Sequence, residues 1–201
     1  MSKNNFNRYK EVFHNNNGIL RYSQAMKLGI PRYAIDKFIG TGELTKESRG
    51  IYRLKDLEPL SNPDLVQVSV LIPKSVICLI SALYFYNLTT QIPHRVYIAL
   101  KQNVKAPKIK YPPIKVFHFS DKSFIAGIED HVVDGIKISI YSREKTIADC
   151  FKFRKQIETS IALEALKDYM NQPNPDIQSI IKYAKINRVE NVIRPYLETL
   201  V

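Results

Sequence analysis

The sequence predicts an α+β protein, with a small helical unit and strand hairpin at the N-terminus and a larger mixed α/β domain closed by C-terminal helices. Two amphipathic helical segments and a Gly-bounded hairpin follow one another over residues 18–54. Strand-like alternation occupies the middle of the chain, and helical periodicity returns from residue 142 onward. Turn-forming residues 55–62 separate the two parts, so we place the domains at residues 1–58 and 59–201.

The charge balance favours a polyanionic partner. The 201 residues carry 30 Lys and Arg against 19 Asp and Glu, a formal net charge of +11. Residues 1–60 hold eleven basic and six acidic residues, and the remainder holds 19 and 13, so both parts are basic. Nucleic acid suits such a surplus because each neutralised phosphate releases counterions. A charge that serves only solubility is the alternative.

Other composition signals point to a reduced, cytoplasmic protein. Cys78 and Cys150 lie in apolar stretches and read as small buried hydrophobes, with no disulfide framework. The first ten residues lack the apolar core of a signal peptide, and the apolar run 76–88 is too short to span a bilayer. We therefore expect no membrane association, no metal and no cofactor.

Residues 18–54 have the order of helix, turn and strand signals that is typical of a winged helix-turn-helix, and a further helix precedes them. A first helix is expected over 6–16, with Phe6, Tyr9, Val12 and Phe13 on one face. Ser23 is suited to cap a second helix that Gly29 ends, and Pro31 is suited to the first position of a third. In this third helix Ala34, Ile35, Phe38 and Ile39 form the apolar face, while Arg32, Tyr33, Asp36 and Lys37 form the other.

A hairpin, the wing, is expected to follow, with strands over 43–46 and 50–54 joined by a turn over 47–50. This order of elements typically lays one helix in the major groove of DNA, although two packed helices with a Gly turn also occur without DNA. We assign DNA contacts here to Arg21, Ser23, Arg32, Tyr33, Lys37, Lys46 and Arg49.

The second domain reads as helices, then strands, then helices. Helices are expected over 64–71 and 73–88, and strands over 95–100, 114–119 and 136–141. Ser142 is expected to cap a helix reaching about residue 157, and Asp176 a helix over 177–184. A further helix lies around 161–169, and the tail 189–201 is helical in pattern with a kink at Pro195.

The segment 101–115 is the densest acid-free basic run of the chain. It holds three prolines, Tyr111 and five lysines: Lys101, Lys105, Lys108, Lys110 and Lys115. An extended basic segment of this kind could follow a phosphate backbone with Tyr111 as a stacking surface, so we add the five lysines to the DNA contacts. A solvated loop between two strands is the alternative.

The sequence supports no catalytic residues. It has no Gly-rich phosphate loop, no Gly-x-Ser-x-Gly element and no paired metal ligands. Asp130 and Asp134 suggest a nuclease only faintly, and Asp134–Gly135 is better explained as a hairpin turn. We expect Asp149 to make structural hydrogen bonds. We expect the basic residues of the helix after Ser142, including Lys145 and Lys152, to form a solvated face, and a second DNA-contacting face is the alternative.

The whole chain resembles the AbiEi family of antitoxins, from bacterial abortive-infection toxin–antitoxin systems. The resemblance is carried by GELTKESRGIYRL, by ICLISALYFYNL followed by RVYIALKQ, by ISIYSREKTIADCFKF, and by the helical end from ALKDYM to YLETLV. The third of these segments is similar to the family's strand-then-helix core, including Arg143, Thr146 and Asp149.

The resemblance implies a two-domain protein whose winged helix binds inverted repeats of operator DNA and represses its own operon. It also implies a C-terminal domain that counters a nucleotidyltransferase-like toxin, generally without a stable complex. We expect a free monomer and more than one copy on DNA. The chain lacks the Gly-Ser and Asp-x-Asp elements of the toxin itself.

Two other hypotheses remain open from the sequence. One is a winged-helix transcriptional regulator with a ligand- or partner-sensing C-terminal domain that is not linked to a toxin. The other is a nuclease or nucleotide-processing enzyme targeted by a winged helix, which would need a cluster of carboxylates that the sequence does not offer.

Overall fold

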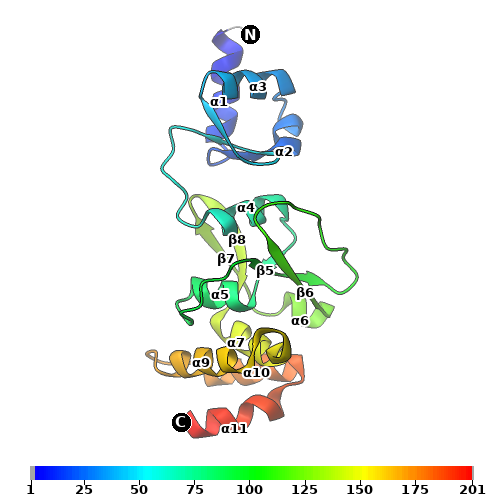
Figure 1. Ribbon diagram of the computed structural model, residues 1–201, viewed down its shortest axis with the longest axis vertical. Coiled ribbons are helices and arrows are strands. Elements are labelled where there is room, and N and C mark those ends of the chain that lie inside the picture. Colours follow the sequence, from blue (N-terminus) through cyan, green and yellow to red (C-terminus); the bar gives the residue numbers. More distant parts are fainter. Residues whose placement is uncertain (1–2, 201) are drawn as a thin grey trace. The chain divides into compact units, whose positions relative to one another are not determined.

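The helix-turn-helix-like elements expected at the N-terminus are present in the computed structural model, which describes residues 3–200 (Figure 1). The chain divides into two units. The first contains the described residues up to Pro73 together with Lys110–Pro112 and Val132–Lys137, and the second contains the rest. Each unit has its own hydrophobic core.

The first unit is built from four helices and a three-stranded antiparallel sheet of order β1-β3-β2. Its elements are α1 (Lys3–His14), β1 (Ile19–Arg21), α2 (Tyr22–Lys27), α3 (Arg32–Gly40), β2 (Leu44–Ser48), β3 (Ile51–Leu54) and α4 (Pro63–Leu71). The expected apolar face of α1 is confirmed: Phe13 is fully buried, and Phe6, Tyr9 and Val12 pack against the same core. Packing of this amphipathic face anchors α1, since so short a helix is marginal alone.

The turn between α2 and α3 depends on Gly29. Its φ is +81°, in the left-handed region that disfavours a side chain. Leu28 and Gly29 leave the helix, and the amide of Ile30 donates to the carbonyl of Ala25, 2.9 Å away. Ile30 is thereby turned into the core, where it is fully buried beside Ala34.

Three details of this region differ from the sequence prediction. Ser23 does not cap α2, because the helix begins at Tyr22 with Arg21 at the N-cap, where the Arg21 amide donates to the side chain of Gln24. Pro31 is the N-cap of α3, and not its first residue. Ile39 is 36% exposed, because the buried stripe of α3 ends with Phe38 as the helix runs out at Gly40.

The predicted hairpin is present, with a shorter turn than expected. Glu47 and Ser48 belong to β2, so only Arg49 and Gly50 form the turn, with Gly50 at φ +81°. A register shift between Lys46 and Ser48 inserts an extra residue into β2. The short strand β1 escaped prediction because three residues are too few to show an alternating pattern.

The second unit contains a five-stranded mixed sheet of order β6-β5-β4-β8-β7 and seven helices (Figure 1). Its elements, as described, are β4 (Val76–Ile77), α5 (Leu79–Phe85), β5 (Val96–Lys101), β6 (Ile114–Phe119), α6 (Asp121–Ile125), β7 (Ile128–Val133), β8 (Ile136–Tyr141), α7 (Arg143–Lys152), α8 (Arg154–Ile157), α9 (Thr159–Met170), α10 (Ile177–Asn187) and α11 (Glu190–Leu200). The strand β7 and the short helix α6 were not predicted.

Strands β5 and β6 are parallel neighbours, with Val96 opposite Ile114 and Lys101 opposite Phe119. A parallel pair cannot be closed by a tight turn, because the chain must return along the length of the strand. Residues 102–113 make this return without helix or strand. The three prolines of this loop suit such an extended path.

The single helix expected over 73–88 is wrong. Val76 and Ile77 form the central strand β4, between β5 and β8, and α5 starts only at Leu79. All-round apolar character fits a strand buried on both faces as well as a buried helix, so periodicity could not separate them.

The C-terminal helices largely follow the prediction. Ser142 caps α7 by accepting from the amide of Lys145 at 3.2 Å, and Asp176 caps α10 by accepting from the amide of Ser179 at 2.9 Å. The helix after Ser142 is interrupted at Phe153, and α11 contains Pro195 within it. The last residue of the expected tail, Val201, lies outside the described residues. Within residues 3–200, no helix has the length and apolarity needed to cross a membrane.

Candidate nucleic-acid interface

The outer face of α3 is held in place by its buried face. Ala34, Ile35 and Phe38 are almost completely buried, and the Phe38 ring lies 4.5 Å from that of Phe6 between centroids. This packing leaves the opposite face in solvent. The residues that the sequence places there are all exposed: Arg32, Tyr33, Asp36 and Lys37. Their contact with DNA stays a prediction.

Arg32 and Asp36 form an exposed ion pair one helical turn apart, with 3.7 Å between Nε and Oδ2. Such a pair contributes little to stability in water. It does restrict the guanidinium, which carries five donors in a planar fork suited to a guanine edge or a phosphate. The carboxylate is also a negative charge on the face that would approach phosphates.

Two tyrosines beside α3 were missed by sequence reasoning. The rings of Tyr22 on α2 and Tyr52 on β3 lie 6.5 Å apart between centroids, and both are half-buried. Burial raises the pKa of Tyr52, and the charge of Asp36 raises it further while Arg32 opposes this. The sequence signal that could have identified them was their position next to predicted basic contacts, with Tyr22 at the start of the second helix and Tyr52 in the second strand of the hairpin.

The hairpin presents two basic side chains. Lys46 is exposed on β2 and lies opposite Tyr52 in the strand register. Arg49 is exposed in the turn, where no strand neighbour restricts it. Both positions are open to a phosphate backbone, and Lys46 shares its region with the two tyrosines.

Arg21 and Ser23 are exposed at the start of α2. The Nη1 atom of Arg21 donates to the carbonyl of Leu71, the last residue of α4, at 3.2 Å. This bond uses only part of the donor capacity of the guanidinium. Ser23 remains a candidate contact only, since it has no capping role.

The five lysines of residues 101–115 do not form one acid-free segment in space. Lys101 ends β5 and lies 3.5 Å from the carboxylate of Asp121, a residue outside the segment. Lys115 lies in β6, half-buried, and its Nζ donates to the carbonyl of Gln156 at 3.1 Å. Because Lys115 lies opposite Tyr97, the strand register separates Lys101 from Lys115 by four residues, or roughly 13 Å along the strand.

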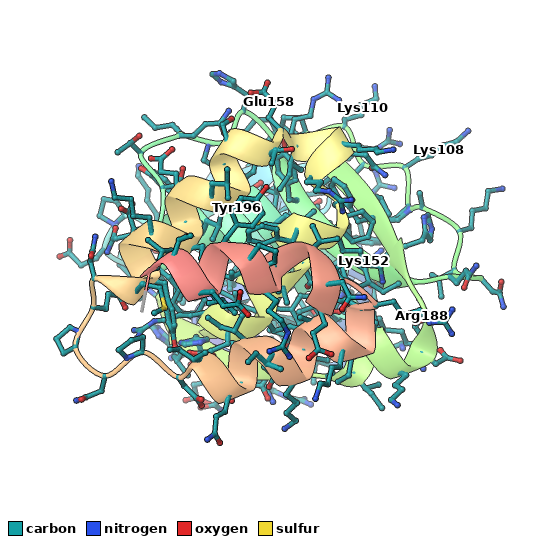
Figure 2. All side chains as sticks on the ribbon, turned by 90° about the horizontal axis from the view of Figure 1, so that it is seen from below. Lys108, Lys110, Lys152, Glu158, Arg188 and Tyr196 are labelled. Atoms are coloured by element: carbon teal, nitrogen blue, oxygen red, sulfur yellow. The ribbon has the colours of Figure 1, made fainter. Side chains whose placement is uncertain are left out.

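Lys105, Lys108 and Lys110 are exposed on the connecting loop, which fits both a solvated loop and a loop that follows DNA. Figure 2 shows Lys108 and Lys110 extending from this loop. Tyr111 is 53% exposed beside them, so its ring is available for stacking. The predicted basic segment is therefore reduced to three lysines and one tyrosine.

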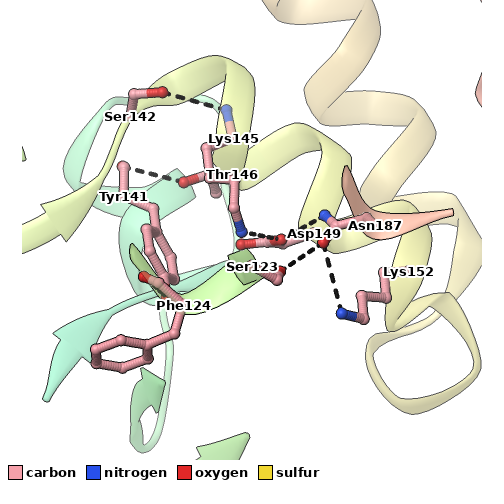
Figure 3. Close-up of polar contacts among 9 residues, drawn as sticks. All are labelled: Ser123, Phe124, Tyr141, Ser142, Lys145, Thr146, Asp149, Lys152 and Asn187. Carbon is pink, nitrogen blue, oxygen red and sulfur yellow. Dashed lines mark hydrogen bonds and ion pairs between the residues drawn. The ribbon is translucent and has the colours of Figure 1, made fainter. Parts of the chain in front are cut away.

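The helix α7 carries a buried charged network in place of the expected solvated face (Figure 3). Lys145 and Asp149 are fully buried and form an ion pair one turn apart. The ammonium of Lys145 also lies over the rings of Tyr141 and Phe119, at 4.2 and 4.8 Å from their centroids. Lys152 is only half-buried, with Nζ 3.5 Å from Oδ1 of Asn187.

Asn187 and Ser123 complete this network. The amide of Asn187 donates to Asp149 at 2.7 Å and its carbonyl accepts from the hydroxyl of Ser123 at 2.6 Å. Three helices, α6, α7 and α10, are thus joined through the side chain of Asn187. The structural hydrogen-bond role predicted for Asp149 is confirmed.

The network is sealed from solvent, which argues for a structural role. Burial raises the pKa of Asp149, and the nearby Lys145 and Asn187 only partly oppose it. Burial also raises the pKa values of the Cys78 and Cys150 thiols, so neither is a reactive thiolate at neutral pH. Among residues 3–200, no group of three or more His, Cys, Asp and Glu side chains is arranged to hold a metal ion.

Comparison with known proteins agrees with the N-terminal part of this description. No curated protein matches the chain significantly. Residues 7–55, which run from α1 through β3, match the model of a family described as "Transcriptional regulator, AbiEi antitoxin". The resemblance to the AbiEi antitoxins recognised from the sequence is thereby confirmed over residues 7–55.

Proposed function

We propose that this protein is a DNA-binding antitoxin that represses its own toxin–antitoxin operon and has no enzymatic activity. The observation that carries the proposal is the outer face of α3. It presents Arg32, Tyr33 and Lys37 on a helix whose other face is locked into the core, within the segment that matches the family. Such a face is suited to base edges in the major groove.

We infer that the first 58 residues act as a winged helix-turn-helix. In this reading α3 is the recognition helix and the β2–β3 hairpin is the wing. The support is the antiparallel sheet β1-β3-β2, whose β2–β3 hairpin follows α2 and α3 and carries the exposed Lys46 and Arg49. The wing lysine and arginine contact phosphates, while Arg32 reads a base.

The proposed operator consists of inverted repeats, each read by one copy of the protein. A single short recognition helix covers only a few base pairs, so two copies increase both affinity and specificity. The protein is a monomer when free. Residues 59–201 form the antitoxin domain, which counters a nucleotidyltransferase-like toxin without forming a stable complex.

Two measurements test the proposal together. Co-expression of this chain with a neighbouring nucleotidyltransferase-like gene is expected to restore growth that the neighbour alone arrests. Gel-shift titration of the full-length protein on the DNA upstream of the pair is expected to show specific binding, with unrelated DNA of equal length as the control. Growth arrest that persists on co-expression would reject the antitoxin role, and equal affinity for both DNAs would reject the repressor role.

A matched variant separates the two activities. Replacing Arg32, Tyr33 and Lys37 together with Ala removes the proposed reading face without touching its buried side. This variant is expected to lose operator binding and to keep its rescue of growth. Loss of both activities in a folded variant would contradict the division of labour between the two domains.

A further inference from the structure

The second unit has a pocket of about 270 Å³ whose lining includes three basic side chains, His94, Arg95 and Lys115. None of the lining residues, all of them in the described part of the chain, is acidic. The wall also contains Tyr97 and the 66% exposed side chain of Ile92. The pocket therefore combines concentrated positive charge with an aromatic ring and an apolar rim.

The sheet builds the base of this pocket. Tyr97 on β5 and Lys115 on β6 are direct neighbours in the strand register. The backbone amide of Tyr97 donates to the hydroxyl of Ser81 on α5 at 2.9 Å, and the amide of Val96 donates to the carbonyl of Pro113 at 2.8 Å. Helix and sheet thus fix the backbone beneath the two side chains.

Lys115 is held in place. Its Nζ donates to the carbonyl of Gln156 and lies 5.3 and 5.4 Å from the ring centroids of Tyr97 and Phe117. These two rings are stacked, 5.7 Å apart and inclined by 17°. An ammonium has three donors, so the bond to Gln156 leaves capacity for a ligand. A side chain that is already ordered loses little entropy when a ligand binds.

Arg95 supplies the second anchoring charge. It lines the same pocket as Tyr97 and is exposed to solvent, so its guanidinium can reach a ligand there. A guanidinium fork binds phosphate oxygens in pairs, and an ammonium adds a point charge. His94, on the same loop, offers a further donor.

We propose that this pocket binds the phosphate group of a nucleotide, with Arg95 and Lys115 on the phosphate and Tyr97 and Ile92 against the sugar or base. The volume of about 270 Å³ is just below the range of about 300–1,000 Å³ for ligand pockets, which suits a small ligand such as a mononucleotide or the terminal nucleotide of a strand. The proposal does not depend on operator binding by α3. Under this proposal Lys115 binds a ligand in the pocket and does not belong to the DNA-contacting segment predicted over residues 101–115.

The test is calorimetric titration of the full-length protein with adenosine 5′-monophosphate and with adenosine. The monophosphate is expected to bind at least tenfold more tightly than the nucleoside. Arg95→Gln and Lys115→Gln are each expected to weaken binding of the monophosphate at least tenfold. Lys108→Gln, which removes the same charge from the exposed loop, is the matched control and is expected to bind like the unaltered protein.

Arg95 is exposed, so R95Q is expected to keep the fold and to remain informative even where K115Q unfolds the protein. Tetranucleotides with and without a 5′-phosphate distinguish the sources: tighter binding of the phosphorylated strand than of the monophosphate supports a strand end, and weaker binding supports a free nucleotide. Equal binding of monophosphate and adenosine, unchanged binding by R95Q, or equally tight binding of a glutamate-rich peptide would each overturn the proposal.

Discussion

At the scale of single residues, the most demanding feature is the charge buried in α7. Lys145 and Asp149 have no exposed surface, so the pair must be satisfied internally, by Asn187 and by the rings over the ammonium. Removing water from two charges costs several kcal/mol, which the pair recovers only when its geometry is complete. Breaking the pair is therefore expected to be costly, whereas replacing both partners is not.

Lys145→Met is expected to lower the free energy of unfolding by about 3–5 kcal/mol, because it leaves the Asp149 carboxylate buried without its partner. Urea unfolding followed by circular dichroism measures this. The double variant Lys145→Met/Asp149→Leu is expected to recover a large part of the loss, since no charge then remains buried. A double variant that is less stable than the single one would show that the ion pair itself stabilises the fold.

The proposed reading face of α3 yields two changes of opposite sign. Arg32→Ala is expected to weaken operator binding by about 1–3 kcal/mol if Arg32 reads a base. Asp36→Asn is expected to strengthen binding several-fold, because it removes the one carboxylate among the residues assigned to this face. Gel-shift titration at fixed salt measures both. If Arg32, Tyr33 and Lys37 can each be replaced by Ala with no change in affinity, α3 does not contact the operator.

At the scale of elements, the predictability of the fold follows from local signals. The α2–α3 pair could be predicted because Gly29, Pro31 and a three-residue apolar stripe act within ten residues of one another. The strand β4 could not, because only pairing with β5 and β8 makes Val76–Ile77 a strand. Lys145 could not be assigned to the interior either, since an i,i+4 Lys–Asp pair usually lies on a helix surface.

The candidate DNA contacts also divide into residues whose environment follows from local sequence and residues whose environment depends on distant partners. Exposure of Arg32 and Lys37 could be predicted from helical periodicity alone. The positions of Lys101 and Lys115 depend on the parallel pairing of β5 with β6 and on Asp121 and Gln156, which are distant in sequence. Long-range partners of this kind leave no pattern in the local sequence.

The β2–β3 hairpin is expected to contact phosphate and not bases. Lys46→Gln and Arg49→Gln should each weaken specific and non-specific binding alike, and each should reduce the salt slope of log K by about one. Affinities measured at several salt concentrations, between about 50 and 200 mM, test this, because each variant should lose roughly one phosphate contact. A variant that loses sequence preference while its salt slope stays constant would place that residue against a base.

The cap of α10 has a pH signature. A hydrogen bond from the side chain of Ser179 and, to a smaller extent, one from its backbone amide lower the pKa of Asp176 below its ordinary value. The carboxylate therefore contributes stability above its ordinary pKa, and this contribution disappears as the pH falls through the lowered value. Asp176→Ala is expected to lower the melting temperature at pH 7 and to leave it unchanged near about pH 2. Glu164→Ala, an exposed acid on α9, is the control, and an equal loss at both pH values would rule out this ionic cap.

At the scale of the whole molecule, both parts of the chain carry an excess of positive charge. The lysines of residues 101–115 lie in different environments in the structure. Lys101 is paired with Asp121, and Lys115 lies in the pocket beside Tyr97. Neither is free to follow a phosphate backbone. On the loop of the second domain, the positive charge that remains available to DNA comes from Lys105, Lys108 and Lys110.

These three exposed lysines are expected to add non-specific DNA affinity to the full-length protein. The loop that carries them is an extended crossover rich in proline, so its charges are spread out along the chain and can meet successive phosphates. Replacing all three with Gln should weaken binding to operator and unrelated DNA equally, and should reduce the salt slope by up to about 0.9 for each lysine in contact. Replacing Lys101 and Lys115 instead should leave the slope nearly constant, because Lys101 faces the carboxylate of Asp121 and Lys115 lies in the pocket proposed for a single nucleotide and not on the loop. A slope that responds to the second pair and not to the three loop lysines would mean that DNA lies along the β5–β6 edge of the sheet, and the loop would then be only a solvated connection.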